Sequence, residues 1–189
     1  MDNKATKLPG VRLLVPRVFK DARGSFSETW NDSALRKAGV ELTFVQDNQS
    51  VNPKTGTIRA LHYQGPEFAQ DKLVRVVRGA VLDVAVDVRV GSPHYGDWVG
   101  VELSEDNALQ LLVPKGFLHG FVTRAPDTVV LYKTTDVYAP DFDGGVHFAD
   151  SELAIDWGIP TDEALVSDKD AHAPTLAEWK SPFVYEETS

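Results

Sequence analysis

A single histidine, His62, lies between two apolar, strand-like runs in the stretch from Ile58 to Arg75. Arg59 stands three residues before it and Lys72 ten residues after it. A histidine can take a proton near neutral pH, and a lysine can stabilise the negative charge that develops when a proton leaves a carbon next to a carbonyl. With a tyrosine or a second histidine as the acid, these residue types predict proton abstraction beside a carbonyl. Taken alone, a lone histidine is more often a satisfied structural residue than a base.

Other chemistries fit the sequence less well. The segment 114–119 has the P-x-G-x-x-H spacing of the second metal motif of cupins, which are double-sheet jelly rolls. The first cupin motif would need two histidines separated by one residue and a glutamate, but the corresponding segment, 61–64, reads LHYQ. Because a catalytic metal normally has three or more protein ligands, we expect a site without a metal. The chain also has no cysteine, no G-x-S-x-G elbow and no phosphate loop.

The elements that must position these side chains are mostly short strands. Apolar runs are separated by Asp, Asn, Gly and Pro turns at intervals of roughly ten residues, which is typical of antiparallel sandwiches and barrels. We expect strands at Leu8–Phe19 (broken by two prolines), Phe44–Val51, Lys72–Val77, Ala80–Val90, Trp98–Leu103, Leu109–Val113, Gly120–Arg124 and Thr128–Thr134. One short helix is expected between Asn31 and Gly39, and ordered pieces at Ser151–Trp157 and Ser167–Ala171.

Strand alternation predicts which side chains share a face. In the run Ala80–Val90 it places Val81, Asp83, Ala85 and Asp87 on one side and indicates a half-buried sheet. Around His62 it places Ala60 and Gln64 on the same face as the histidine, and Arg59, Leu61 and Tyr63 on the other. Arg59 and His62 are an odd number of residues apart, so either a bulge intervenes or one of them serves a different site. The second possibility suits a dimer whose strands exchange between subunits.

Length and composition set the outer bounds. The 189 residues, 42% hydrophobic and 25% charged, are expected to form one domain, 1–189. No window is apolar enough for a membrane span or a signal peptide, and there are no cysteines, so a cytoplasmic protein is expected. A formal net charge of -9 argues against a nucleic-acid surface. An anionic ligand must therefore be held by a few focused arginines and lysines.

Seven separated motifs carry a resemblance to a known family. They are FxDxRGxFxE at 19–28, FVQDN at 44–48, RALHYQ at 59–64, QDKLV at 70–74, PKGFLHGF at 114–121, YK at 132–133 and SDKD at 167–170. In this order they resemble the motif series of the dTDP-4-dehydrorhamnose 3,5-epimerases. The resemblance implies a dimeric cupin-type jelly roll that acts on a thymidine-diphosphate 4-keto-6-deoxyhexose without a metal or an organic cofactor.

The resemblance also implies roles for single residues. The catalytic residues would be His62 as the base, Asp170 as its orienting partner, Tyr132 as the opposing acid and Lys72 at the enolate oxygen. The substrate-binding residues would be Arg23 and Arg59 at the diphosphate, Glu28, Gln46 and Asn48 at the nucleoside, His119 at the sugar or phosphate end, and Asp143 and Lys169. The family usually has a glutamate near the position of Asp143, which is one methylene shorter. These roles make chemical sense, because a carboxylate fixes the tautomer of an imidazole and arginine forks match phosphate oxygens.

Each role has a structural alternative, and the function has rivals. Arg23 would otherwise be a solvated loop charge, Lys72 a strand residue with a buried stem, Tyr132 a core aromatic and Asp170 a cap. One rival function is the inversion of a single carbon of another deoxysugar nucleotide. Another is a non-catalytic cupin that binds a sugar nucleotide. The pair of His62 and Tyr132 favours an enzyme, because a binding protein needs no acid and base.

Overall fold

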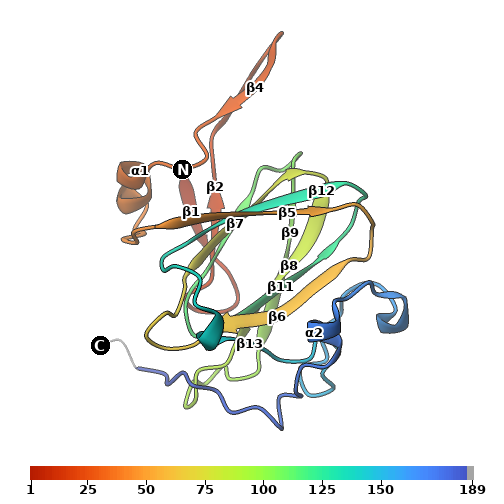
Figure 1. Cartoon of the computed structure of the whole chain (residues 1–189). Helices are drawn as coiled ribbons and strands as arrows, with labels where there is room; N and C mark the ends of the chain where they lie inside the picture. Colours follow the sequence, from red (N-terminus) through yellow and green to blue (C-terminus); the bar gives the residue numbers. More distant parts are fainter. Residues whose placement is uncertain (187–189) are drawn as a thin grey trace.

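The structure is a computed structural model, and it describes residues 1–186. Two antiparallel sheets pack against each other, and a two-stranded hairpin projects from them (Figure 1). The six-stranded sheet has the order β1 (Asp2–Ala5), β2 (Arg12–Val15), β10 (Gln110–Val113), β7 (Lys72–Arg78), β12 (Thr128–Thr134) and β5 (Gln46–Asn52). The five-stranded sheet has the order β13 (Asp143–Gly145), β6 (Ile58–Gln64), β11 (Phe117–Thr123), β8 (Ala80–Asp87) and β9 (Trp98–Ser104). The hairpin consists of β3 (Val18–Asp21) and β4 (Gly24–Ser27).

The helices are few and short, so the prediction of a mainly β, cupin-like antiparallel jelly roll is confirmed. They are α1 (Asp32–Lys37), α2 (Asp168–Ala171) and the 3-10 turns η1 (Pro140–Phe142) and η2 (Thr161–Glu163). The predicted helix is α1, and its N-cap is Asn31, whose side chain accepts a hydrogen bond from the Ala34 amide. No helix in the described part of the chain is long and apolar enough to cross a bilayer.

The core lies between the sheets, where alternate residues of both point inward. Its members include Val74 and Val76 of β7, Val130 of β12, and Phe117 and Phe121 of β11. These side chains fill only part of the interior. Toward one end the inward positions become polar, and that end forms the cavity described below.

Both sheets are also covered on parts of their outer faces. Helix α1 packs Leu35 onto Leu14 and Leu73 of the six-stranded sheet. The C-terminal third of the chain packs Trp157 and Phe183 onto the five-stranded sheet. The prediction that the run from Ala80 forms a half-buried strand is therefore wrong. The side chains of β8 are buried on both faces, because a distant segment covers the outer one.

The strand predictions hold where local alternation is clear. β12 has the predicted bounds, and β5, β7, β9 and β10 differ from theirs by one or two residues at an end. β8 ends three residues earlier than expected and β11 begins three residues earlier. The short strands β1, β4 and β13 were not predicted. The piece 151–157 forms neither helix nor strand, although Leu153, Ile155 and Trp157 anchor it in the core.

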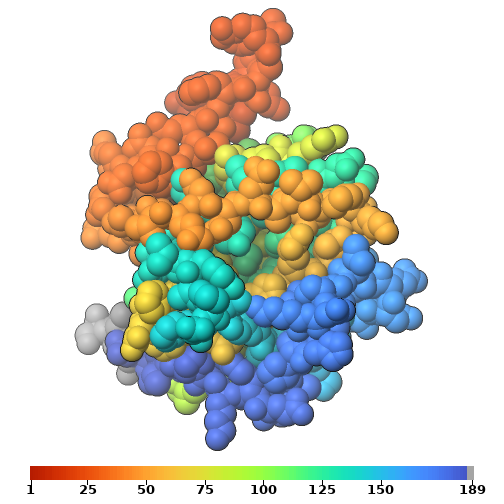
Figure 2. Space-filling model, in the orientation of Figure 1, coloured from red at the N-terminus to blue at the C-terminus, as the bar shows by residue number. Residues whose placement is uncertain are grey.

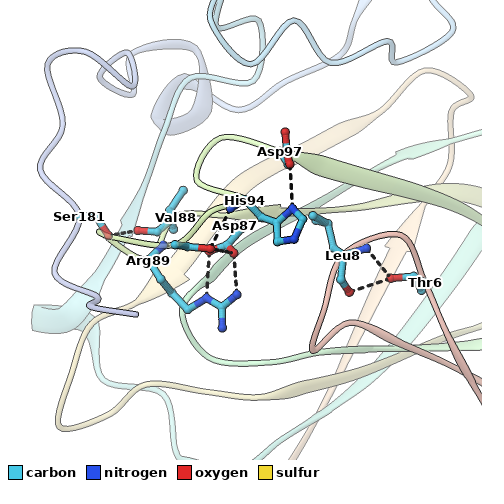
Figure 3. A network of polar contacts seen from close by, with 9 residues as sticks. Thr6, Leu8, Asp87, Val88, Arg89, His94, Asp97 and Ser181 are labelled. Atoms are coloured by element: carbon cyan, nitrogen blue, oxygen red, sulfur yellow. Dashed lines mark hydrogen bonds and ion pairs between the residues drawn. The ribbon is translucent and has the colours of Figure 1, made fainter. Parts of the chain in front are cut away.

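A buried ion pair fixes the end of β8 (Figure 3). The Asp87 carboxylate is fully buried and accepts hydrogen bonds from Arg89 Nε at 2.9 Å, Arg89 Nη2 at 2.5 Å and Ser92 Oγ at 2.7 Å. Burial alone would raise the pKa of Asp87, but the hydrogen bonds from Arg89 and Ser92 hold it below its ordinary value. The Arg89 guanidinium lies over the rings of Phe117 and Tyr185, so it also fastens the C-terminal segment.

We expect Asp87→Asn to lower the free energy of unfolding by about 3 kcal/mol, because it leaves the guanidinium without its counter-charge. Thermal or urea unfolding measures the change. Asp97→Asn is the control, since the Asp97 carboxylate pairs with His94 in the same region but its side chain is 62% exposed. The control is expected to stay within about 0.5 kcal/mol of the parent. Equal losses in the two variants would contradict the claim that the buried Asp87–Arg89 pair stabilises the fold more than the exposed His94–Asp97 pair.

Candidate active site

A cavity of about 470 Å³ opens at the polar end of the interior. In Figure 2 it appears as a hollow between the orange strand β5 and the teal and blue segments below it. Its walls come from β6, β7, β12 and β13 and from the segment that leads into α2. The residues with predicted roles that line it are Arg59, His62, Lys72, Tyr132, Asp143, Lys169 and Asp170. Segments from most of the chain length thus meet at one place.

A bulge in β6 brings Arg59 and His62 to the same cavity. On β11, His119 is paired with His62 and Phe121 with Arg59, so the register shifts between these two pairs. Arg59 and His62 are three residues apart and would face opposite sides of a regular strand. The extra residue in β6 lets both side chains face the same cavity. Of the two predicted alternatives, the structure has the bulge. The predicted face assignment is wrong for Ala60, which packs with Leu61 on the outer side.

His62 forms a hydrogen-bonded pair with Asp170. Its Nε2 atom lies 2.7 Å from Asp170 Oδ1. Asp170 is 4% exposed, and its amide donates to Ser167 Oγ, the N-cap of α2. Burial alone would raise the pKa of Asp170, but the hydrogen bond and charge of His62 outweigh it and lower the pKa. A neutral His62 therefore carries its proton on Nε2, next to the carboxylate, and leaves the Nδ1 lone pair free to accept a proton.

Lys72, the first residue of β7, contributes a cation to the cavity. Burial lowers the pKa of Lys72 to about 8, against the opposing effect of the negative charges on Asp143 and Asp83. At neutral pH the side chain is still mostly an ammonium. It can therefore stabilise an oxyanion in a partly dehydrated environment.

Tyr132 reaches the cavity from β12. Burial raises the pKa of its phenol, with Asp143 acting in the same direction and the positive charge of Arg59 acting against both. The phenol is consequently protonated at neutral pH. It can donate a proton but is a poor base.

Three polar side chains meet at the mouth of the cavity. Lys169 Nζ lies 2.5 Å from Asp143 Oδ2, and Tyr138 Oη donates to the same oxygen at 3.3 Å. Asp143 belongs to β13, which pairs with β6 beside the histidine. Asp143, which stands where the family usually has the longer glutamate, is thus held by Lys169 and Tyr138.

Five predicted binding residues do not line this cavity. Asn48 lines a second, smaller cavity of about 360 Å³, and Gln46 donates through Nε2 to Asn48 Oδ1 at 3.0 Å. His119 is 8% exposed and its Nε2 lies 2.8 Å from Asp83 Oδ1. Arg23 and Glu28 belong to the projecting hairpin and the segment after it. Their predicted roles remain predictions.

Some residues in or beside the site were given no role from the sequence, among them Asp83 and Tyr138. Asp83 was recognised only as an inward residue of β8, yet its carboxylate holds His119 and acts on the charge of Lys72. Its sequence signal was a charged residue between the apolar residues Val81 and Ala85 of the same strand face. Tyr138 was missed because it follows β12 in an irregular segment. No group of three or more potential metal-ligating side chains occurs within residues 1–186.

Comparison with known proteins identifies the family. The model of the dTDP-4-dehydrorhamnose 3,5-epimerase family matches residues 5–178. The chain belongs to this family. A dTDP-4-dehydrorhamnose 3,5-epimerase of Sinorhizobium fredii is 49% identical over 175 residues, which cover 93% of this chain and 89% of the relative.

Solved structures of the family have the same fold. The dTDP-4-dehydrorhamnose 3,5-epimerase of Bacillus anthracis, with TDP and PPi bound, has a TM-score of 0.89 at 47% identity and covers 93% of this chain and 99% of that one. The dTDP-6-deoxy-D-glucose-3,5-epimerase of Legionella pneumophila, in complex with dTDP-4-keto-L-rhamnose, has a TM-score of 0.88 at 40% identity and covers 93% of each chain. The resemblance drawn from the seven motifs is confirmed.

Proposed function

We propose that this member of the dTDP-4-dehydrorhamnose 3,5-epimerase family inverts C3 and C5 of dTDP-4-keto-6-deoxy-D-glucose and so makes dTDP-4-keto-L-rhamnose. One observation carries the proposal: a single cavity brings together the general base His62 with its partner Asp170, the ammonium of Lys72 and the phenol of Tyr132. These are the base, the oxyanion partner and the acid that the reaction requires.

The C4 ketone acidifies the hydrogens on both neighbouring carbons. His62 Nδ1 takes the proton from the carbon, and the electron pair moves onto the ketone oxygen to give an enolate, whose charge the Lys72 ammonium stabilises. A proton is then returned to the carbon from the opposite face of the ring. Tyr132 delivers it at C5, and a water can do so at C3. His62 then releases its proton to water, and the Tyr132 phenolate takes one up. Two such cycles invert both centres without a metal or an organic cofactor.

Deuterium labelling tests the reaction. The protein is incubated with dTDP-4-keto-6-deoxy-D-glucose in deuterated water, and the position of deuterium is read by NMR. Label and inversion at both C3 and C5 support the proposal. Label at one carbon would mean an epimerase of a single centre, and label at neither would mean a protein that only binds the nucleotide sugar.

We also propose that the protein is a cytoplasmic homodimer in which the hairpin β3–β4 reaches the cavity of the other copy. The hairpin stands clear of both sheets (Figure 1), and the Arg23 side chain is 90% exposed. Phe19 and Phe26 are 50% and 71% exposed, which is unusual for large aromatic side chains. A second copy would cover these rings and would supply the cavity with a further arginine for the diphosphate.

Mixing two impaired variants, assayed at a substrate concentration well below the KM of Arg23→Ala, tests this arrangement. In a mixed dimer of Arg23→Ala and His62→Ala, one of the two sites receives both an intact hairpin and an intact base. Activity of the mixture well above that of either variant supports the exchange. Light scattering must show a dimer, and a monomeric protein with full activity would refute the arrangement.

Arg59→Ala is expected to raise KM about tenfold or more with kcat nearly retained. An arginine that grips the diphosphate contributes similarly to the ground state and the transition state, so its loss weakens binding without slowing chemistry. Steady-state kinetics over a range of substrate concentrations measures both constants. A normal KM with a collapsed kcat would place Arg59 in the chemistry instead.

The pH dependence of kcat/KM is expected to show a basic limb centred near pH 8. Since the pKa of Lys72 is lowered to about 8, its ammonium is present below that pH and is lost above it, so activity falls as the pH rises. In Lys72→Arg the guanidinium stays charged, and the limb near pH 8 is expected to disappear from the remaining activity. A limb that persists in the variant would assign the titration to another group.

A further inference from the structure

Asn52 is a buried amide that no part of the proposed mechanism uses. It is the last residue of β5 and is 1% exposed. Its Oδ1 atom accepts a hydrogen bond from Arg59 Nε at 2.8 Å. The contact spans the corner between the two sheets, because β5 belongs to one sheet and β6 to the other.

The orientation of the amide is fixed by its remaining contacts. Asn52 Nδ2 donates to the Thr128 carbonyl oxygen at 3.2 Å and to Ser50 Oγ at 3.2 Å. Both N–H groups therefore have acceptors, and a flipped amide would place its oxygen against the Thr128 carbonyl. The oxygen is thus held toward Arg59.

The guanidinium is held without being neutralised. Within residues 1–186, no carboxylate lies within 4.0 Å of the Arg59 guanidinium, and its terminal amino groups make no hydrogen bond to the protein. The terminal groups carry the donors that match two phosphate oxygens. A carboxylate at position 52 would also accept from the arginine, but it would offset the positive charge, repel a phosphate and place its second oxygen against the Thr128 carbonyl. A neutral amide oxygen fixes it and leaves the full charge to the ligand.

We propose that Asn52 is a positioning residue for the diphosphate of the substrate, acting through Arg59. This inference rests on the proposed function, because it takes Arg59 to be the diphosphate ligand. The side chain that binds would be pre-ordered by Asn52, so binding would lose less rotamer entropy. Asn52 itself touches no substrate atom in this proposal.

The test measures the Kd of dTDP by calorimetry at fixed ionic strength. Asn52→Leu keeps the volume and removes the acceptor. It is expected to weaken dTDP binding about fivefold to twentyfold, because the arginine keeps its charge but loses its fixed orientation. In an Arg59→Ala background the same substitution is expected to change Kd less than about twofold, because the pair acts as a unit. Thermal melting of each variant accompanies the binding data.

Each outcome bears on one claim. An equal loss in both backgrounds would make Asn52 merely structural, and an unchanged Kd in the single variant would overturn its role. Asn52→Asp keeps the shape and the acceptor for Arg59, although it loses the donor to the Thr128 carbonyl, and it provides a second variant if the leucine variant fails to fold. It is expected to bind dTDP more weakly than the parent, and wild-type affinity would refute the need for a neutral acceptor. If Arg59→Ala alone leaves Kd unchanged, the diphosphate role of Arg59 fails, and not only the inference about Asn52.

Discussion

His62→Ala is expected to lower the rate of proton exchange at both C3 and C5 by about 10² to 10⁴, the usual contribution of a positioned general base. Asp170 holds the ring through Nε2 at 2.7 Å and leaves Nδ1 as the proton acceptor. No other imidazole lines the cavity as formed by residues 1–186. NMR in deuterated water follows each carbon separately, so one variant reports on both centres.

The control is His94→Ala. His94 pairs with Asp97 in a loop outside the cavity, so its removal should leave exchange unchanged at both carbons. Thermal melting shows whether each variant is folded. Exchange that persists in His62→Ala at one carbon would mean that another residue is the base for that carbon, and persistence at both would remove His62 from the chemistry.

The sequence predicted best where structure is determined locally. Strand β12 alternates cleanly between inward and outward residues, and its bounds follow from that pattern. Helix α1 carries its own capping residue, Asn31. In both cases the signal lies within a few neighbouring residues, so no knowledge of the partner segments is needed.

The misses arise from contacts between distant segments. Both faces of β8 are buried because the C-terminal third of the chain covers the outer one, and alternation within the strand cannot report that cover. The bulge in β6 depends on its register with β11. The odd spacing of Arg59 and His62 left two possibilities open, a bulge or a different site for one of the two residues, and only the pairing with β11 decides between them.

The candidate site shows the same division. His62 and Lys72 were recognisable by residue type within one stretch, whereas Asp170 reaches His62 across 108 positions of sequence. Only the motif series placed it at the histidine, because a short acidic turn has no distinctive pattern. Asn52 was missed for a related reason: an asparagine next to a proline is typical of a turn, and its contact with Arg59 requires the corner between the two sheets.

Tyr132→Phe is expected to separate the two centres, since inversion needs a proton removed on one face of the ring and supplied on the other. The substitution keeps the aromatic volume and removes only the phenolic proton, so packing and abstraction by His62 should survive. Burial raises the pKa of this phenol, which keeps it a proton donor at neutral pH. We expect inversion at C5 to fall about 10²- to 10³-fold and exchange at C3 to stay within about tenfold, because a water can supply the proton at C3.

The measurement is NMR of the product mixture in deuterated water, with Tyr95→Phe as the control because Tyr95 is an exposed tyrosine away from the cavity. Exchange and inversion must be recorded separately at each carbon. If Tyr132 is the acid for C5, the variant should still incorporate deuterium at C5, because the enolate still forms. The deuterium should be added mainly to the original face, because the enolate is then reprotonated from the side of His62. Equal losses at both carbons in a well-folded variant would refute a selective acid, and unchanged inversion at C5 would remove Tyr132 from the mechanism.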